Sequence, residues 1–135
     1  MSLSAHLQFG DNQISRYSKQ YQLKEVKCHF QKSHDNVRPT SDAFCERIDV
    51  SVFIPGKEDL SLYEWFSSGS LQTGRILVEQ TNPIHDNETQ WHEILFEDAV
   101  CFSMKEEYKL DERRRILHLS FMAAHIEADG VVFKR

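Results

Sequence analysis

Hydrophobic side chains recur at every second position through much of the chain. The clearest run spans residues 44–54, in which one parity carries the large apolar side chains Phe44, Ile48, Val50, Val52 and Ile54. The other parity of this run is mostly polar. Such alternation predicts a strand with one face in a core and the other in water.

Two more runs alternate in the same way. We expect residues 100–108 to direct Val100, Phe102, Met104 and Tyr108 inward, and residues 115–125 to do the same with Leu117, Leu119, Phe121 and Ala123. Shorter strand-like segments are residues 5–9, 13–17, 21–30, 75–81 and 90–96, and turn-forming residues separate several of them. Six to eight short strands at this spacing predict an antiparallel β-barrel or sandwich.

One segment departs from this pattern and predicts a short helix over residues 62–68. Ser61 and Glu64 have the spacing of a capping box, and Gly69 is a suitable stop. Leu62, Trp65 and Phe66 fall on one helical face, so we expect them to anchor the helix in the core. A helix of two turns is marginal by itself and depends on such packing.

Two features indicate that the chain does not act alone. In residues 114–126 the alternate positions that should face outward also carry apolar side chains, namely Ile116, Met122, Ala124 and Ile126. An apolar outer face needs cover from the helix or from another chain. Residues 31–43 form a long polar connection that includes Arg38 and Pro39, and connections of this length are usually functional or mobile. We expect it to project as a loop.

The composition is that of one soluble domain spanning residues 1–135. The 135 residues carry 16 basic and 21 acidic side chains, a net charge of −5, which argues against nucleic-acid binding. No apolar run approaches the roughly 20 residues of a membrane helix, so we expect no membrane insertion. The first residues lack the pattern of a secretory signal peptide. The 3 cysteines are far apart and predict synthesis in a reducing cytoplasm.

Candidate chemistry is sparse. The densest histidine groups, Cys28-His29 with His34 and His85 with His92, lack the converging spacing of a zinc site. No nucleophile elbow, P-loop or dinucleotide motif is present. Cys45 and Cys101 have the parity of exposed thiols but no activating basic neighbour. We therefore expect no catalytic residue, no metal and no cofactor.

Charged residues flank a predicted hairpin turn near residues 110–112. Glu106 and Glu107 precede the turn, and Arg113 and Arg114 follow it. Two interpretations stay open: the two clusters pair across the hairpin, or the surplus arginine charge meets acidic groups of a neighbouring subunit.

Several residue runs, in order, resemble a known family: Leu62-Tyr63-Glu64-Trp65-Phe66, Gly74-Arg75-Ile76, Ile94-Leu95-Phe96-Glu97-Asp98-Ala99, the opening run 2–7, Arg38-Pro39-Thr40 and the closing run 121–126. The family is the TssD (Hcp-type) tube protein of type VI secretion systems, in its Bacteroidetes form. The resemblance extends from about residue 3 to residue 126.

This resemblance implies a small antiparallel β-barrel of two packed sheets, with one short α-helix on the outside. It further implies hexameric rings that stack into a hollow tube, which a contractile sheath expels and which carries effectors in its lumen. The expected partners are then further copies of the chain and the sheath, baseplate or spike, and effector proteins. The chain would be made in the cytoplasm and secreted without a signal peptide. Within this picture Arg38 and Pro39 are candidates for ring stacking, and Glu106, Glu107, Arg113 and Arg114 for subunit contacts.

Three alternatives remain at this point. A bacteriophage tail-tube subunit would share the architecture. A monomeric barrel that binds a small apolar ligand would be stabilised by that ligand. A small metal-dependent enzyme would use the histidines.

Overall fold

The computed structural model describes residues 2–32, 34–35, 38–39, 43–54, 59–82 and 88–134. The elements in chain order are β1 (Ser2–Asp11), β2 (Arg16–Gln31), β3 (His34–Asp35), β4 (Arg38–Pro39), β5 (Phe44–Phe53), α1 (Ser61–Ser68), β6 (Gln72–Asn82), β7 (Glu88–Lys109), β8 (Arg114–Met122), β9 (His125–Ala128) and β10 (Val131–Lys134).

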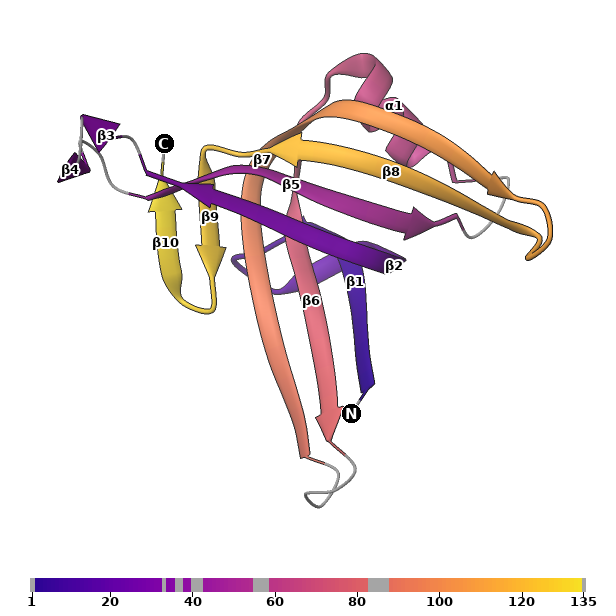
Figure 1. The fold of residues 1–135 in the computed structure, drawn as a ribbon, viewed down its shortest axis with the longest axis horizontal. Helices are drawn as coiled ribbons and strands as arrows, with labels where there is room; N and C mark the ends of the chain where they lie inside the picture. Colours follow the sequence, from indigo (N-terminus) through magenta and orange to yellow (C-terminus); the bar gives the residue numbers. More distant parts are fainter. Residues whose placement is uncertain are drawn as a thin grey trace.

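Six of the strands form a closed antiparallel barrel. The hydrogen-bonded order is β7-β6-β1-β2-β5-β8, and a further pairing of β8 with β7 closes the circle. Strand β7 is 22 residues long, so its first half pairs with β6 and its second half with β8. In Figure 1, β1, β6 and the first half of β7 run across the direction of β2, β5, β8 and the second half of β7. The predicted barrel of two packed sheets with one outer helix is confirmed.

The barrel interior is filled by aromatic rings. Phe9 of β1 meets Trp65 of α1 edge-on at 5.2 Å between ring centroids, and Trp65 lies 5.2 Å from Phe121 of β8. Phe96 of β7 completes the group at 5.0 Å from Phe121. Each of these four side chains is at most 3% exposed. The alternation predicted for β8, and for β5 from Ile48 onward, holds, since Ile48, Val50, Val52, Leu117, Leu119 and Phe121 are all buried.

The inward direction predicted for β7 is wrong for Val100 and Phe102 and right for Met104, which packs against the core. Val100 and Phe102 are 36% and 44% exposed, whereas Cys101 is buried. The pairing of β7 with β8 shifts between Cys101 and Ser103, so that Phe102 is an extra residue without a partner in β8. Such a β-bulge reverses the parity of every residue beyond it. Tyr108, expected to face inward, is 59% exposed at the far end of the strand.

A second bulge lies in β5 and corrects the expectation for Cys45. The register of β2 with β5 shifts so that Glu46 has no partner between Cys45 and Arg47. Cys45 therefore lies on the same side as Ile48 and is 4% exposed. Neither Cys45 nor Cys101 is the exposed thiol that parity alone predicted.

Helix α1 begins differently from the predicted capping box. Leu60 is the N-cap and makes no side-chain cap, and the Glu64 N–H donates to the Leu60 carbonyl at 2.9 Å. Asp59, one residue earlier, accepts from the Ser61 N–H at 3.0 Å instead. The helix ends as expected at Gly69, whose φ of 68° is the left-handed conformation that glycine tolerates best.

The helix presents a narrower apolar face to the core than we expected. Leu62 and Trp65 are 3% and 0% exposed, but Phe66 is 37% exposed. The Trp65 Nε1–H donates to the Ala99 carbonyl of β7 at 3.0 Å, which fixes the rotation of the helix. With Trp65 held there, its neighbour Phe66 lies at the edge of the face rather than in the core.

The apolar outer parity of residues 114–126 does not need a second chain. Strand β8 ends at Met122, and Ile126 belongs to β9, which pairs with the first half of β7. Ile126 is 1% exposed, and Ile116 is also 1% exposed within this one chain. That part of the argument for assembly is therefore wrong. The sequence pattern also gave no indication of β9 and β10.

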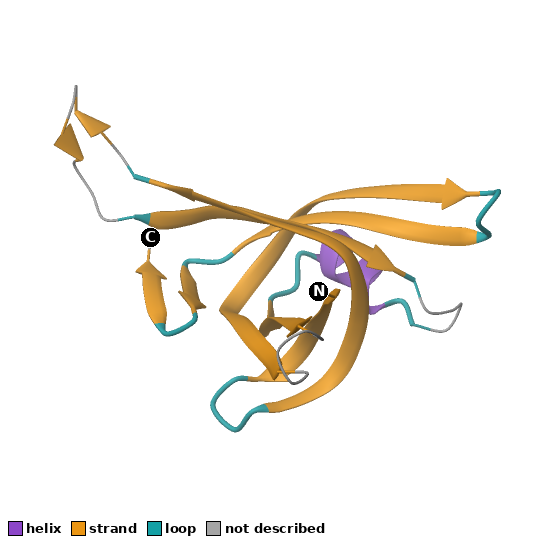
Figure 2. Cartoon of the chain, turned by 60° about the horizontal axis from the view of Figure 1, so that its bottom comes forward, coloured by secondary structure: helices purple, strands orange, loops and turns teal. Residues whose placement is uncertain are grey.

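Two connections also differ from the sequence interpretation. Residues 12–15, which overlap the expected strand 13–17, form the turn between β1 and β2. The connection 31–43 contains β3 and β4, which pair as a small separate sheet, His34 with Pro39 and Asp35 with Arg38. Figure 2 shows this small sheet and the β7–β8 hairpin at opposite ends of the molecule, as does Figure 1.

Candidate assembly surfaces

The described residues form no cluster suited to metal chemistry. No group of three or more histidine, cysteine, aspartate or glutamate side chains gathers among them. Cys28 packs against the core, whereas the neighbouring His29 lies on the outer face, where its Nε2 is 2.8 Å from Asp49 Oδ2. His85 lies outside the described residues, as does the side chain of His34.

The thiols are buried or, for Cys28, half-buried, and they are therefore poor nucleophiles. Burial raises the pKa of Cys28 to about 11 and that of Cys101 to about 11, because the thiolate is disfavoured away from water. All 3 cysteines are free. The arrangement gives no activated nucleophile at these positions.

A polar ladder, which the sequence analysis missed, crosses the outer face of β5, β8 and β7. Ser51 Oγ is 2.8 Å from His118 Nδ1, and His118 Nε2 is 2.7 Å from Glu107 Oε2. The order serine, histidine, glutamate resembles a hydrolase triad, but Ser51 is only 7% exposed on a regular strand. Its hydroxyl is closed to an external substrate. Ser51 and His118 are direct partners in the pairing of β5 with β8. The ladder could therefore have been predicted only from the register between these two strands.

A second part of the ladder surrounds Asp49. The Ser120 hydroxyl donates to Asp49 Oδ1 at 2.5 Å, and Arg47 Nε lies 3.3 Å from Asp49 Oδ2. Partial burial opposes ionisation of Asp49, but the hydrogen bonds from Ser120, His29 and Arg47 outweigh it and lower its pKa. The ladder therefore keeps this face charged, ordered and hydrophilic.

The β7–β8 hairpin does not pair its acidic and basic clusters in the predicted way. Glu106 and Glu107 lie opposite Leu117 and Ile116, and the nearest contact between the clusters is Arg115 Nε to Glu106 Oε1 at 3.9 Å. In this register Glu107 lies one position and Glu106 two positions before Tyr108, the residue that pairs with Arg115.

Both glutamates find other partners inside the chain. Glu106 accepts hydrogen bonds from the hydroxyls of Tyr108 and Tyr63, and these lower its pKa. The His118 ring and the Lys109 ammonium lower the pKa of Glu107 to about 2. The two glutamates are therefore committed to contacts within their own chain.

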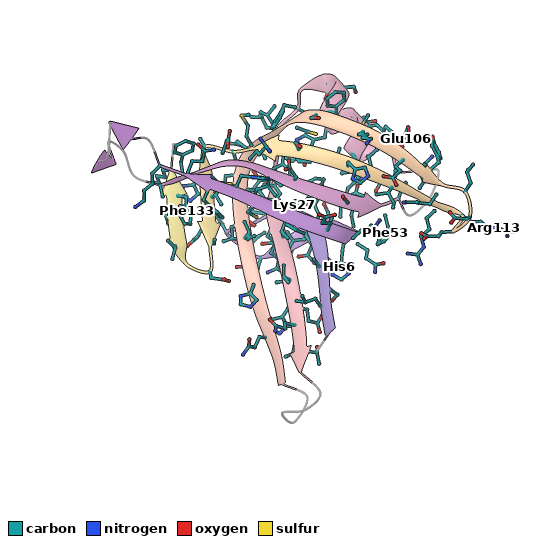
Figure 3. The ribbon with its side chains drawn as sticks, viewed as in Figure 1. His6, Lys27, Phe53, Glu106, Arg113 and Phe133 are labelled. Carbon is teal, nitrogen blue, oxygen red and sulfur yellow. The ribbon has the colours of Figure 1, made fainter. Side chains whose placement is uncertain are left out.

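The arginines of the hairpin are in a different position. Within the described parts of the chain, neither Arg113 nor Arg114 has an ion-pair partner. Arg114 lies over the ring of Phe53, 5.1 Å from its centroid. Figure 3 shows Arg113 at the outermost point of the hairpin. Of the four charged candidates, these two remain available to another molecule.

Exposed apolar side chains lie on several outer elements of the molecule. Phe102 and Val100 are on β7, Val131 and Val132 on the edge strand β10, and the exposed fraction of the two β10 valines is 58% and 48%. Apolar edge strands readily pair with other chains. The backbones of Arg38 and Pro39 form β4 at the far end of the molecule. The side chains of these two residues are outside the described part of the structure.

No helix among the described residues has the length and apolar character needed to cross a bilayer.

The fold defines a class: a small antiparallel β-barrel, closed by the pairing of β7 with β8, with one short helix among its described elements. A family model described as hemolysin coregulated protein Hcp (TssD) matches residues 1–135. The chain therefore belongs to the Hcp (TssD) family, the structural tube proteins of type VI secretion.

Solved structures of Hcp proteins have the same fold. Hcp1 from Flavobacterium johnsoniae is 19% identical, with 100% of both chains covered and a TM-score of 0.67. The secreted protein Hcp3 from Pseudomonas aeruginosa is 10% identical over 99% of this chain and 97% of that chain, with a TM-score of 0.68. Hcp1 from Salmonella typhimurium is 11% identical over 98% of this chain and 92% of that chain, with a TM-score of 0.67. No curated protein matches the sequence.

Proposed function

We propose that this chain, acting as one tube-subunit domain, forms hexameric rings that stack into the inner tube of a type VI secretion apparatus. Contraction of a sheath expels the tube, which carries effectors in its lumen and meets a baseplate or spike at its end. The role is structural and needs no catalysis or cofactor. The observation that carries this proposal is the match of the family model to the whole chain.

The proposal places synthesis in the cytoplasm and the working location outside the cell. Free thiols, of which those of Cys45 and Cys101 are buried, suit a chain made under reducing conditions. Exposed apolar side chains on β7 and β10 suit a subunit that covers them by self-association. Contacts that close generate rings, and axial contacts that do not close generate filaments, so a tube needs both kinds.

Within the ring, Arg113 and Arg114 rather than Glu106 and Glu107 make the charged contacts with the neighbouring subunit. This assignment is supported by the internal partners of the two glutamates and by the lack of such partners for the arginines among the described residues. For ring-to-ring contact we propose Arg38 and Pro39, because β4 lies at the end of the molecule opposite the hairpin (Figure 2).

The monomeric ligand-binding alternative is not favoured. A barrel of that kind keeps an interior cavity, whereas here Phe9, Trp65, Phe96 and Phe121 meet at 5.0–6.4 Å between ring centroids inside the barrel. The family model also matches the type VI protein rather than a phage tail tube.

Light scattering of the full chain, followed by negative-stain imaging, tests the proposal. We expect a mass of six chains and annular particles that stack at high concentration. Arg38→Ala should leave single rings intact but shorten or abolish stacks, while the matched control Lys32→Ala, at an exposed position nearby, should stack normally. A strict monomer at high concentration contradicts the proposed function.

A further inference from the structure

The tip of the β7–β8 hairpin forms a hollow lined by guanidinium groups. Arg113, Arg114 and Arg115 line it from the hairpin, and Phe53 and Ile54 line it from the end of β5, with Gln22 of β2. None of these described lining residues is acidic. The acids of the turn itself, Asp111 and Glu112, are not among them.

One of the guanidinium groups in this hollow rests against an aromatic ring. Arg114 lies over Phe53, 5.1 Å from the ring centroid, a cation–π contact that leaves its N–H groups able to donate to another molecule. Arg115 is only loosely tied to Glu106, at 3.9 Å. A planar, pre-oriented guanidinium binds a carboxylate with two parallel hydrogen bonds. The hollow therefore has the chemistry of a carboxylate receptor.

A complementary acidic region lies elsewhere on the same chain. Asp11, Glu97 and Asp98 line a hollow beside the β1–β2 turn. Asp11 faces Arg16 across that hairpin, so its charge is partly balanced. Glu97 and Asp98 are exposed, and neither forms an ion pair with a described residue.

The chain cannot join these two regions to each other within one molecule. Asp98 and Lys109, which lies at the start of the hairpin turn, are eleven positions apart along β7. At about 3.3 Å per residue, this amounts to roughly 36 Å along a strand that is paired over its length. Figure 3 shows Arg113 at the end of this long hairpin, away from the barrel. Any contact between the two regions must therefore be intermolecular.

We propose that the arginine hollow of one copy binds Glu97 and Asp98 of the next copy, head to tail. The inference rests on the proposed function and deepens it by naming the partner surfaces of the ring contact. Because the two surfaces differ and lie far apart on the molecule, each copy uses its hairpin toward one neighbour and its acidic region toward the other. Such heterologous contacts close into rings when the rotation between copies allows it.

Charge reversal tests this contact. Arg113→Glu with Arg114→Glu reverses the hairpin, and Glu97→Lys with Asp98→Lys reverses the acidic region. Each double variant alone should raise the protein concentration of half-assembly at least tenfold, because like charges then meet at the contact. Lys24→Glu with Lys134→Glu is the control with the same charge change as the hairpin variant, placed at exposed positions outside both regions. It should assemble as the wild type does.

Mixing the two reversed variants is the decisive experiment. The negative hairpin of the first variant fits the positive region of the second, and the positive hairpin of the second fits the unchanged acids of the first. An equimolar mixture should therefore recover assembly as alternating, even-numbered rings, detected by light scattering and by mass spectrometry of the intact complex. Mixing either variant with the control variant should give much less recovery.

Circular dichroism and the thermal midpoint verify that each variant is folded. Asp98 has a φ of 52°, a conformation that asparagine tolerates better than lysine. Glu97→Gln with Asp98→Asn therefore serves as a second, milder variant, for which weakened assembly is again expected. If the wild type assembles and the reversed variants assemble equally well, or if the mixture fails to recover, the proposed contact is wrong while the tube function stands. A wild-type chain that never assembles overturns both.

Discussion

Trp65 provides the sharpest test of how α1 is attached to the barrel. Its side chain is 0% exposed, its ring contacts Phe9 and Phe121, and its indole N–H donates to the Ala99 carbonyl. Truncating a buried tryptophan to alanine typically removes about 3–5 kcal/mol through lost burial and the cavity left behind. The Ala99 carbonyl also loses its donor, which adds about 1 kcal/mol. We therefore expect Trp65→Ala to lower the free energy of unfolding by about 4–6 kcal/mol.

The expected shift in melting temperature follows from the size of the chain. Unfolding entropy of roughly 2.1 cal/mol/K per residue, over 135 residues, gives about 0.28 kcal/mol/K. A loss of about 4 kcal/mol then lowers Tm by about 14 °C. Equilibrium unfolding in urea and thermal scans should be made at concentrations where light scattering shows single chains, because assembly raises apparent stability.

Phe66→Ala is the matched control, one residue away in the same helix. Phe66 is 37% exposed, so its truncation should cost only about 1 kcal/mol, or about 4 °C in Tm. Trp65→Phe, which keeps a ring but removes the N–H donor, should fall between the two and covers the case in which Trp65→Ala does not fold. Equal losses for Trp65→Ala and Phe66→Ala would refute the helix orientation described above.

Three further predictions follow from individual contacts. Although partial burial opposes it, hydrogen bonds to Asp59 lower the pKa of its carboxyl to about 2. A lowered carboxyl pKa stabilises the fold at pH values above the unfolded pKa near 4, so the free energy of unfolding should fall by about 1–2 kcal/mol as the pH drops from about 4 to 2. Asp59→Asn should flatten that pH dependence in urea titrations. Gly74→Ala should lower the free energy of unfolding by at least about 2 kcal/mol, because the added Cβ would overlap the backbone of β1. Gly69→Ala, where the Cβ would meet open space but φ is positive, should cost about 1 kcal/mol. Similar stability losses for the two variants would contradict the close packing of Gly74 against β1. The thiols of Cys28 and Cys101 should react with a disulfide reagent far more slowly in the native protein than in urea at pH 8, and fast native reaction would show that they are accessible.

The sequence pattern predicted well where strands run without interruption. In β5 and β8 the alternating apolar side chains lie in the core as expected, and Gly69 ends the helix. The pattern predicted poorly at the bulges, because one unpaired residue, Phe102 or Glu46, changes the parity of its neighbours without any local signal in the sequence. The exposed side chains on β7 and the burial of Cys101 follow from that single shift.

The candidate surfaces were only partly predictable. Sequence spacing identified Glu106, Glu107, Arg113 and Arg114 as a charged cluster, but it could not separate the glutamates, which have partners in their own chain, from the arginines. That separation depends on the hairpin register and on Tyr63 of α1, which lies 43 positions from Glu106 in the sequence. The acidic region of Glu97 and Asp98 was not recognised, because Asp11, which completes it, is distant in the sequence.

By itself, the amino-acid sequence determined the β-rich fold class and the place of helix α1, because periodicity and turn residues are local properties that survive without knowledge of contacts. The family was indicated separately, by the resemblance of several residue runs in order along the chain. Only the tertiary structure decided how the barrel closes through β7 and β8, which side of β7 faces water and which charges remain unpaired. These depend on register between strands far apart in the sequence, and a shift of one residue exchanges the buried and exposed faces.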